Sequence, residues 1–392
     1  MNKKLKNKQE KGITLIALVV TIVVLLILAG VSISLVLSNS GVISKAKDAR
    51  DQYAEAQTND EKQLNEVSDW IEETVGDTTG GGSAGGSGSK VDGVPIPAGF
   101  VYVGGTKDSG LVISDAAADK EKYKGQTTVG TDLQGNQFVW IPVENIADYK
   151  RAAYDKSVDT GIIDTSTNSI KINYNSSSSS DYYTEAMPSD EKTSVEKNKG
   201  YYIGRYEAGD KESTEAKTLR SSGASTSNTI TIKANQAPYN RIKYTDAKAL
   251  AEGFGTKQNY KNVKTKLVSS YAWDTAIVFI QKTVSDYGNS SPQGNYYDTT
   301  FGYTDITGAS KTKEKYSYKL VPTGQTTGVC NIYDMGGNAF EWTTESYSCT
   351  YSTYSVRGGY YISAIVEGPA GYRTSGSEDA GVNTGFRATL FL

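Results

Sequence analysis

The chain contains no histidine among its 392 residues. Catalysis through Ser-His-Asp or Cys-His groups is therefore excluded, as are imidazole-bound zinc and the histidine-bound iron of non-heme oxygenases. Cysteine is almost absent as well, because only Cys330 and Cys349 occur. Two thiols cannot hold a metal by themselves, and the sequence leaves open whether they pair or stay free.

Clusters of basic residues are also scarce. The formal net charge is −3, and lysines are concentrated in one stretch, residues 1–12. A nucleic-acid-binding domain usually carries a basic patch or stripe. We therefore expect no nucleic-acid partner.

A long apolar run dominates the N-terminal part of the chain. No charged residue occurs from Gly12 to Ser44, and Ile13–Val36 is almost wholly aliphatic. As a helix this stretch would reach roughly 36 Å, enough to cross a bilayer core. Five lysines precede it, so the positive-inside rule predicts a cytoplasmic N-terminus. We expect one membrane span and an extracellular C-terminal domain at the cell membrane.

The segment KGITLIALVVTIVVLLILAG resembles the N-terminus of type IV pilins. The resemblance implies that residues 1–12 are a basic leader, cleaved between Gly12 and Ile13, and that the new amino group of Ile13 is methylated. Ala17 stands where that family usually has Glu. This departure puts filament assembly and methylation in doubt, and an uncleaved signal anchor remains the alternative.

The composition predicts four segments. Residues 1–12 are the leader, 13–76 a pilin-like helix and stalk, 77–92 a Gly/Ser linker, and 93–392 the C-terminal domain. The stretch TTGGGSAGGSGS, residues 78–89, would span roughly 20 Å as a flexible coil. Such a tether favours display of the C-terminal domain over a structural role in a filament wall.

Short apolar runs between Gly, Ser, Asn and Thr mark the C-terminal domain. IKIN, TITIK, FVYVGG and FVWIPV are typical of strands. YAWDTAIVFIQKTV predicts a helix, because Trp273, Ile277 and Ile280 recur at helical spacing. The pattern predicts an α+β domain with much irregular structure.

Several motifs occur in a characteristic order: VPIPAGFVYVGG, NIYDMGGNAFEW, VRGGYY and GFRATLFL. In this order they resemble the formylglycine-generating-enzyme-like domain (sulfatase-modifying-factor type), a variant of the C-type-lectin fold, here with polar insertions near 144–198 and 210–240. That enzyme uses a cysteine pair shortly before the terminal GFR, and residues 371–387 contain no cysteine. We therefore expect the scaffold without an enzymatic activity.

The same resemblance implies a structural Ca²⁺ site. Its oxygen ligands would come from Asp334, Gly337, Ala339 and Glu341, with carboxylates at the two ends and backbone carbonyls between them. Calcium prefers such hard oxygens. The alternative is a turn whose glycines serve packing alone.

Tyrosine is the commonest aromatic residue, with 28 Tyr against 8 Phe and 4 Trp. Tyr and Ser alternate between residues 346 and 361, which is typical of paratopes, although Tyr also suits strands and Ser suits loops. The region resembles the variable proteins of diversity-generating retroelements, in which surface residues vary between fixed RGG and GFR motifs. The candidate ligand-binding residues are Tyr354, Tyr360, Tyr361, Ser363, Ile365, Glu367, Tyr372, Thr374, Ser375, Ser377, Glu378 and Asn383.

Three functions remain open from the sequence. The first is a surface adhesin or receptor that contacts an external protein or glycan, with pilus association as a variant. The second is a minor pilin or pseudopilin, with other pilin subunits as partners. The third, an oxidase of the formylglycine-generating type, is disfavoured by the missing cysteines.

Overall fold

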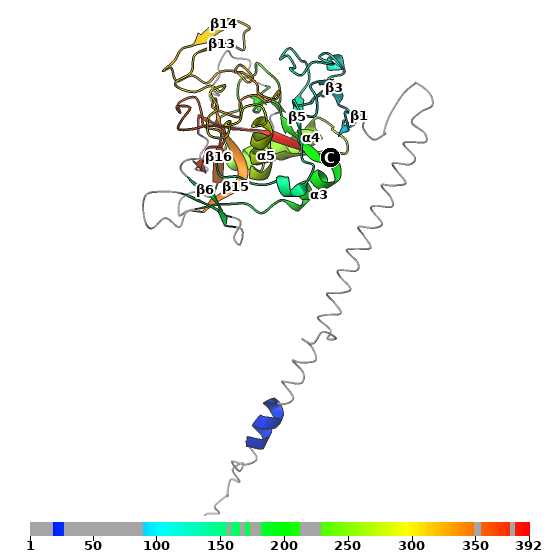
Figure 1. The fold of residues 1–392 in the computed structure, drawn as a ribbon, viewed down its shortest axis with the longest axis vertical. Coiled ribbons are helices and arrows are strands. Elements are labelled where there is room, and N and C mark those ends of the chain that lie inside the picture. Colours follow the sequence, from blue (N-terminus) through cyan, green and yellow to red (C-terminus); the bar gives the residue numbers. More distant parts are fainter. Residues whose placement is uncertain are drawn as a thin grey trace, which may run out of the picture. The chain divides into compact units, whose positions relative to one another are not determined.

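The computed structural model describes residues 19–26, 89–154, 158–164, 169–172, 182–211, 229–348, 354–376 and 381–392. The chain divides into two units, Met1–Ala84 and Gly85–Leu392. In the first unit residues 19–26 are helical (Figure 1). Within the described ranges no helix is both long and apolar enough to span a membrane. Gly12, Ile13, Ala17, most of the predicted span and most of the linker lie outside those ranges.

A six-stranded antiparallel sheet forms the centre of the second unit (Figure 1). Its strand order is β12-β19-β9-β5-β4-β3. The strands are β3 (Val101–Gly104), β4 (Val112–Ser114), β5 (Gln137–Pro142), β9 (Gly200–Gly204), β12 (Lys264–Leu267) and β19 (Ala388–Phe391). The predicted strands FVYVGG and FVWIPV are thereby confirmed as β3 and β5.

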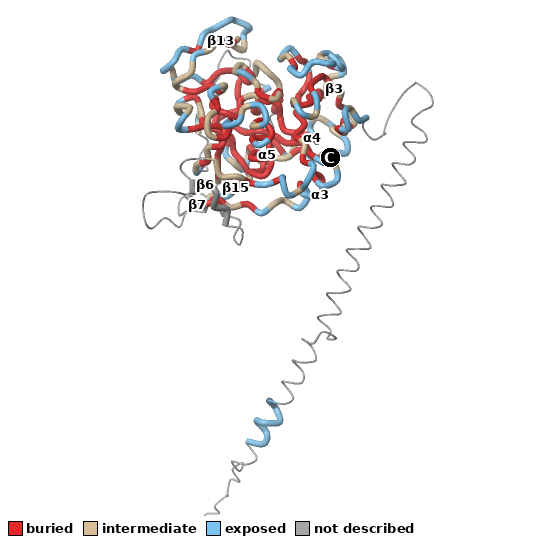
Figure 2. Tube along the Cα trace, in the orientation of Figure 1, coloured by how far each residue is buried: buried red, intermediate tan, exposed pale blue. Residues whose placement is uncertain are grey.

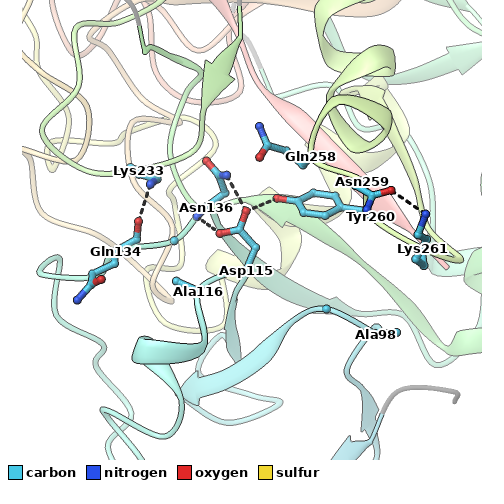
Figure 3. Close-up of a pocket in the computed structure, with 12 residues that line it drawn as sticks. Ala98, Asp115, Ala116, Gln134, Asn136, Lys233, Gln258, Asn259, Tyr260 and Lys261 are labelled. Atoms are coloured by element: carbon cyan, nitrogen blue, oxygen red, sulfur yellow. Dashed lines mark hydrogen bonds between the residues drawn. The ribbon is translucent and has the colours of Figure 1, made fainter. Parts of the chain in front are cut away.

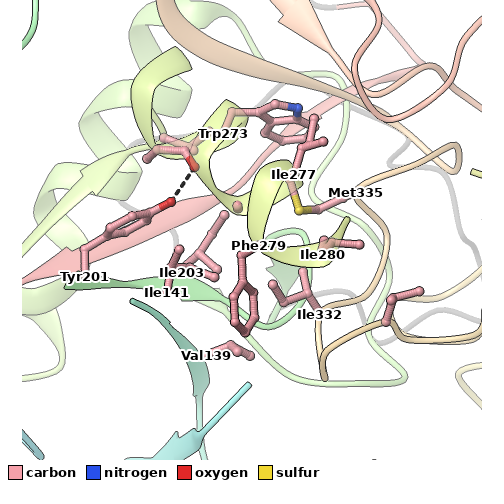
Figure 4. Packing of buried hydrophobic residues seen from close by; sticks show 14 of the residues in the cluster. Val139, Ile141, Tyr201, Ile203, Trp273, Ile277, Phe279, Ile280, Ile332 and Met335 are labelled. Carbon is pink, nitrogen blue, oxygen red and sulfur yellow. Dashed lines mark hydrogen bonds between the residues drawn. The ribbon is translucent and has the colours of Figure 1, made fainter. Parts of the chain in front are cut away.

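Strand β5 shows why both faces of this sheet are buried. Alternate side chains of a strand point to opposite faces. Val139 and Ile141 join one apolar cluster, which contains helix α5 (Ser270–Ile280), as Figure 4 shows. Phe138 and Trp140 join a second cluster, which contains helix α4 (Tyr244–Lys257). The sheet therefore lies between two layers of apolar side chains.

Helix α5 confirms the prediction made from its apolar spacing. The Ser269 side chain caps it by accepting a hydrogen bond from Ala272 N at 3.1 Å. All its residues except Val278 are buried, and it contacts both β5 and β15 (Phe340–Ser348). Helix α4 and helix α3 (Ser189–Asn198) were not predicted. Short 3₁₀ turns occupy Ala117–Asp119 and Ile146–Asp148.

A second sheet carries the C-terminal motifs. Its order is β17-β16-β15-β8-β7-β6, and β18 pairs with β15 in parallel. The strands are β6 (Val158–Asp164), β7 (Ser169–Ile172), β8 (Tyr182–Thr184), β15 (Phe340–Ser348), β16 (Tyr354–Arg357), β17 (Arg373–Gly376) and β18 (Thr384–Phe386). Three hairpins complete the described strands: β1 (Lys90–Val91) with β2 (Val94–Pro95), β10 (Gly209–Asp210) with β11 (Ile230–Thr231), and β13 (Phe301–Thr304) with β14 (Ser310–Lys313). IKIN and TITIK thus contain strands as predicted, and the fold class is α+β.

Many tyrosines belong to the interior, which the sequence did not reveal. Figure 2 shows the buried centre around α5 and exposed stretches along the β13 hairpin. Buried rings include Tyr149, Tyr201, Tyr202, Tyr206, Tyr239 and Tyr296. Tyr hydroxyls inside a protein need a partner, and Tyr201 donates to the Ala272 carbonyl (Figure 4). The high tyrosine content therefore serves the core as well as the surface.

Candidate ligand-binding face

Five charged side chains lie buried beneath β16 and β17: Arg151, Asp274, Glu345, Arg357 and Arg373. None is more than 2% exposed. Arg373 Nε lies 3.0 Å from Glu345 Oε2, and its guanidinium also donates to Asp274. Arg151 Nε lies 3.0 Å from Glu345 Oε1, and Arg357 bonds Asp274. We call these five residues the arginine network.

In the arginine network, opposite charges offset the cost of burying ionised side chains. Burial opposes ionisation of Glu345, but Arg373, Arg151 and Arg357 together hold the pKa of this carboxyl well below its usual range. Three guanidinium groups thus face two carboxylates in the interior. Because removing one partner would leave a buried charge uncompensated, the network tolerates little change.

The two glycines of the RGG motif have a separate steric role. Gly358 N donates to Tyr372 O at 3.3 Å, and its carbonyl accepts from Gly337 N at 2.7 Å. Gly359 has φ +68°, and a Cβ there would lie 1.9 Å from Gly368 O. Only glycine allows this approach. The two glycines of the motif therefore hold the backbone of this scaffold in place.

Eight of the predicted ligand-binding residues are exposed or half-buried. They belong to the segments around the arginine network and the RGG motif. We call them the ligand face: Tyr360, Ser363, Ile365, Glu367, Tyr372, Thr374, Ser375 and Asn383. Thr374 and Ser375 come from β17, next to buried Arg373. Tyr360 and Tyr372 are linked through Phe340, whose ring centroid lies 4.4 and 6.2 Å from theirs.

Four predicted ligand residues do not join this group. Tyr361 is 7% exposed and packs with Leu320 and Ala339, so the prediction of a surface role is corrected. Tyr354 stacks on Tyr244 of α4 at 4.0 Å, at the opposite end of β16 from Arg357. Ser377 and Glu378 lie outside the described residues.

Three further residues beside the ligand face were not predicted from the sequence. Phe340 joins the two tyrosines, while Ile362 and Val366 are 37% and 69% exposed. Large exposed aliphatic side chains beside polar residues are typical of contact surfaces. For Ile362 and Val366, the position shortly after the RGG motif was the available signal.

Three of the predicted calcium ligands lie on the turn that leads into β15, and Glu341 lies in the strand itself. Glu341 accepts from Arg387 through both oxygens, with Nε at 3.0 Å and Nη2 at 2.7 Å. Burial raises the pKa of Glu341 to about 7, although Arg387 opposes this shift. Asp334, Gly337, Ala339 and Glu341 are all buried.

These donors are oxygen atoms of the kind that calcium prefers, but there are too few of them to complete its coordination. They supply two carboxylates and two carbonyls, whereas calcium takes about six to eight oxygens. In the described part of the chain, no group of three or more His, Cys, Asp or Glu is arranged to hold a metal. Calcium at this turn therefore stays a prediction.

Cys330 carries a free thiol. It lies 3.3 Å from Thr283 Oγ1, and burial raises its pKa. Cys349 lies outside the described residues. A protonated, half-buried thiol is a poor nucleophile.

A polar pocket of about 460 Å³ lies elsewhere, between the start of the domain and the loop after α4 (Figure 3). At its centre Asp115 accepts hydrogen bonds from Asn136 N at 2.6 Å and from the Tyr260 hydroxyl at 2.6 Å. Lys233 and Lys261 also line it. None of the predicted site residues lines this pocket.

The fold defines a class of domain: mixed sheets around one buried helix, with long loops on a charged internal scaffold. The chain belongs to the sulfatase-modifying factor enzyme 1-like domain family, whose model matches residues 96–390. No curated protein matches the chain.

Solved structures give weaker likenesses. CarF is 15% identical over 49% of this chain and 87% of its own, with TM-score 0.33. PvdO from Pseudomonas aeruginosa is 16% identical over 50% and 82%, with TM-score 0.29. Treponema denticola variable protein 1 is 12% identical over 68% and 98%, with TM-score 0.34.

Proposed function

We propose that this chain is a surface-displayed binding protein, held in the membrane by its N-terminal segment. It recognises an external protein or glycan through the ligand face and performs no catalysis. One observation carries the proposal: β17 puts Arg373 into the arginine network and Thr374 and Ser375 on the surface. Thr374, on the opposite side of the strand from Arg373, can change without touching the charges that hold the scaffold.

The chemistry of the ligand face supports recognition. Tyr rings supply rigid contact area, and Ser and Thr hydroxyls supply adaptable hydrogen bonds. The absence of cysteine from residues 371–387 supports a non-enzymatic role. We further propose that the face varies between related alleles. Sequencing of many alleles tests this, and substitutions spread evenly along the gene would contradict it.

Arrays of glycans and extracellular proteins test recognition. The full-length protein in detergent is compared with a variant carrying Glu367→Lys and Ser375→Lys, both on exposed positions. We expect array binding to be lost while the melting temperature stays unchanged. The matched control, Glu196→Lys and Thr193→Lys on exposed positions of α3, should bind as the wild type does. Equal loss in both variants would overturn the proposal.

Protease treatment of intact cells tests display. We expect the C-terminal domain to be cleaved without lysis of the cells, because the lysines before the apolar run predict a cytoplasmic N-terminus. Full protection on intact cells, with cleavage after lysis, would place the domain inside and end the proposal.

A further inference from the structure

Three tyrosines form an exposed aromatic cluster beside the β13–β14 hairpin: Tyr297, Tyr316 and Tyr318, here called the tyrosine platform. The rings of Tyr297 and Tyr318 are stacked, with centroids 4.9 Å apart and planes 16° apart. Tyr316 lies 5.2 Å from Tyr297. Tyr316 and Tyr318 are 62% and 63% exposed. Rings held together in water at this exposure indicate a contact surface.

One lysine lies against a platform ring, and further lysines lie close by in the sequence. Lys315 Nζ lies 5.0 Å from the centroid of the Tyr316 ring, and Lys319 lies 5.1 Å from that of Tyr303. Lys311, Lys315 and Lys319 are exposed, with Glu314 as the one acid from 311 to 319. This local excess stands out in a chain of net charge −3.

A buried lysine holds the platform in place. The Lys313 side chain is 0% exposed. It donates to the carbonyls of Tyr296 and Thr299, the latter at 2.8 Å. Tyr316 N also donates to Tyr297 O at 2.6 Å. The rings are thus presented on a fixed backbone, which lowers the entropy lost on binding.

The platform is continuous with the ligand face. Tyr297 N donates to Ser363 O at 2.9 Å, and Ile365 N donates to Asp298 Oδ1 at 3.1 Å. These bonds join the loop that carries Tyr297 to the loop that carries Ser363 and Ile365. One ligand can therefore cover both.

We propose that the tyrosine platform binds an acidic polysaccharide and extends the ligand face, so this inference rests on the proposed function. The apolar face of a sugar ring covers a flat tyrosine ring, and the neighbouring lysines meet its carboxylates. The Tyr316 ring and Lys315 Nζ, 5.0 Å apart, present both kinds of contact together.

Titration of the full-length protein in detergent with polygalacturonate tests the proposal. We expect binding that weakens as salt rises, with at least tenfold loss in Tyr318→Ala and a smaller salt dependence in Lys315→Ala/Lys319→Ala. Neutral dextran should bind weakly or not at all. Tyr182→Ala is the matched control, because Tyr182 is exposed and pairs with Ser348 at the far end of β15, about 27 Å along the strand from Phe340.

Three outcomes overturn the inference: no binding of polygalacturonate, unchanged affinity in Tyr318→Ala, or tighter binding of poly-glutamate or single-stranded DNA. The proposed function fails separately. If polygalacturonate binding depends on Tyr318 while the Glu367→Lys/Ser375→Lys variant keeps all array binding, the platform stands and the ligand face does not.

Discussion

Arg373 and Thr374 are neighbours in β17, yet they belong to opposite regions of the molecule. Arg373 is buried in the arginine network, whereas Thr374 lies half-exposed on the ligand face. Strand alternation makes this division possible, because successive side chains leave a strand on opposite sides. The comparison teaches that one short strand can hold a fixed scaffold and a replaceable surface at once.

The largest effect is expected from a substitution in the arginine network. Arg373→Met leaves Glu345 and Asp274 short of a partner, and we expect a loss of about 3–5 kcal/mol in the free energy of unfolding. Thr374→Ala, on the other side of the same strand, should change it by less than about 0.5 kcal/mol. Urea unfolding followed by tryptophan fluorescence measures both. Similar losses would contradict the division.

A second test concerns the glycines of the RGG motif. Gly359→Ala should lower the free energy of unfolding by about 2–4 kcal/mol, because strain at φ +68° adds to the contact with Gly368 O. Gly308→Ala is the matched control: its φ is +88°, but no atom lies within 4 Å of the added Cβ. It should cost about 1–2 kcal/mol. Equal costs in urea unfolding would refute the steric role of Gly359.

Two buried glutamates should make the free energy of unfolding depend on pH in opposite directions. Burial raises the pKa of Glu185 to about 8, against the opposing hydrogen bond from Thr344. Its stabilising contribution is therefore fully present below about pH 4.3 and is lost as the pH rises to 8. Glu345, with its depressed pKa, contributes in the opposite sense: its stabilisation is present above about pH 4.3 and is lost as the pH falls.

Glu185→Gln should flatten the fall in stability between pH 5 and 8 by up to about 1.4 kcal/mol per pH unit. Unfolding free energies at four pH values measure the slope. Glu196→Gln, on an exposed residue of α3, serves as the control and should leave the slope unchanged. An unaltered slope in Glu185→Gln would show that this carboxyl is ionised in the folded protein.

The smallest expected effect is that of calcium. If the turn before β15 binds it, millimolar Ca²⁺ should stabilise the full-length protein by about 1 kcal/mol relative to EGTA, through simple linkage. Glu341→Gln should abolish this difference. Identical melting curves in Ca²⁺ and EGTA would leave Arg387 as the cation that neutralises Glu341.

The helices show how far sequence patterns reach. Helix α5 was predicted because large apolar residues recur along it. Helix α4 carried a similar signal in Ala247, Leu250, Ala251 and Phe254, but its alanines and glycines hid the pattern. Helix α3 buries only Val195 among large apolar residues, so its sequence shows no helical spacing of apolar residues from which it could be predicted.

The site shows the same limit. The RGG motif and the Tyr/Ser stretch belong to β15 and β16 and to the loop after β16. The partner of Arg357, however, is Asp274, 83 residues earlier in the chain, and pairings at such distances leave no local pattern. Burial of Tyr361 was equally hidden, because Tyr suits both a core and a surface.

Strand β19 has a consequence for biosynthesis. It lies between β12 and β9, so in the described sheet it alone joins β12 to the other strands. Contacts between residues far apart in sequence must wait for the later segment. During translation β12 therefore cannot join the sheet until residues 388–391 have left the ribosome.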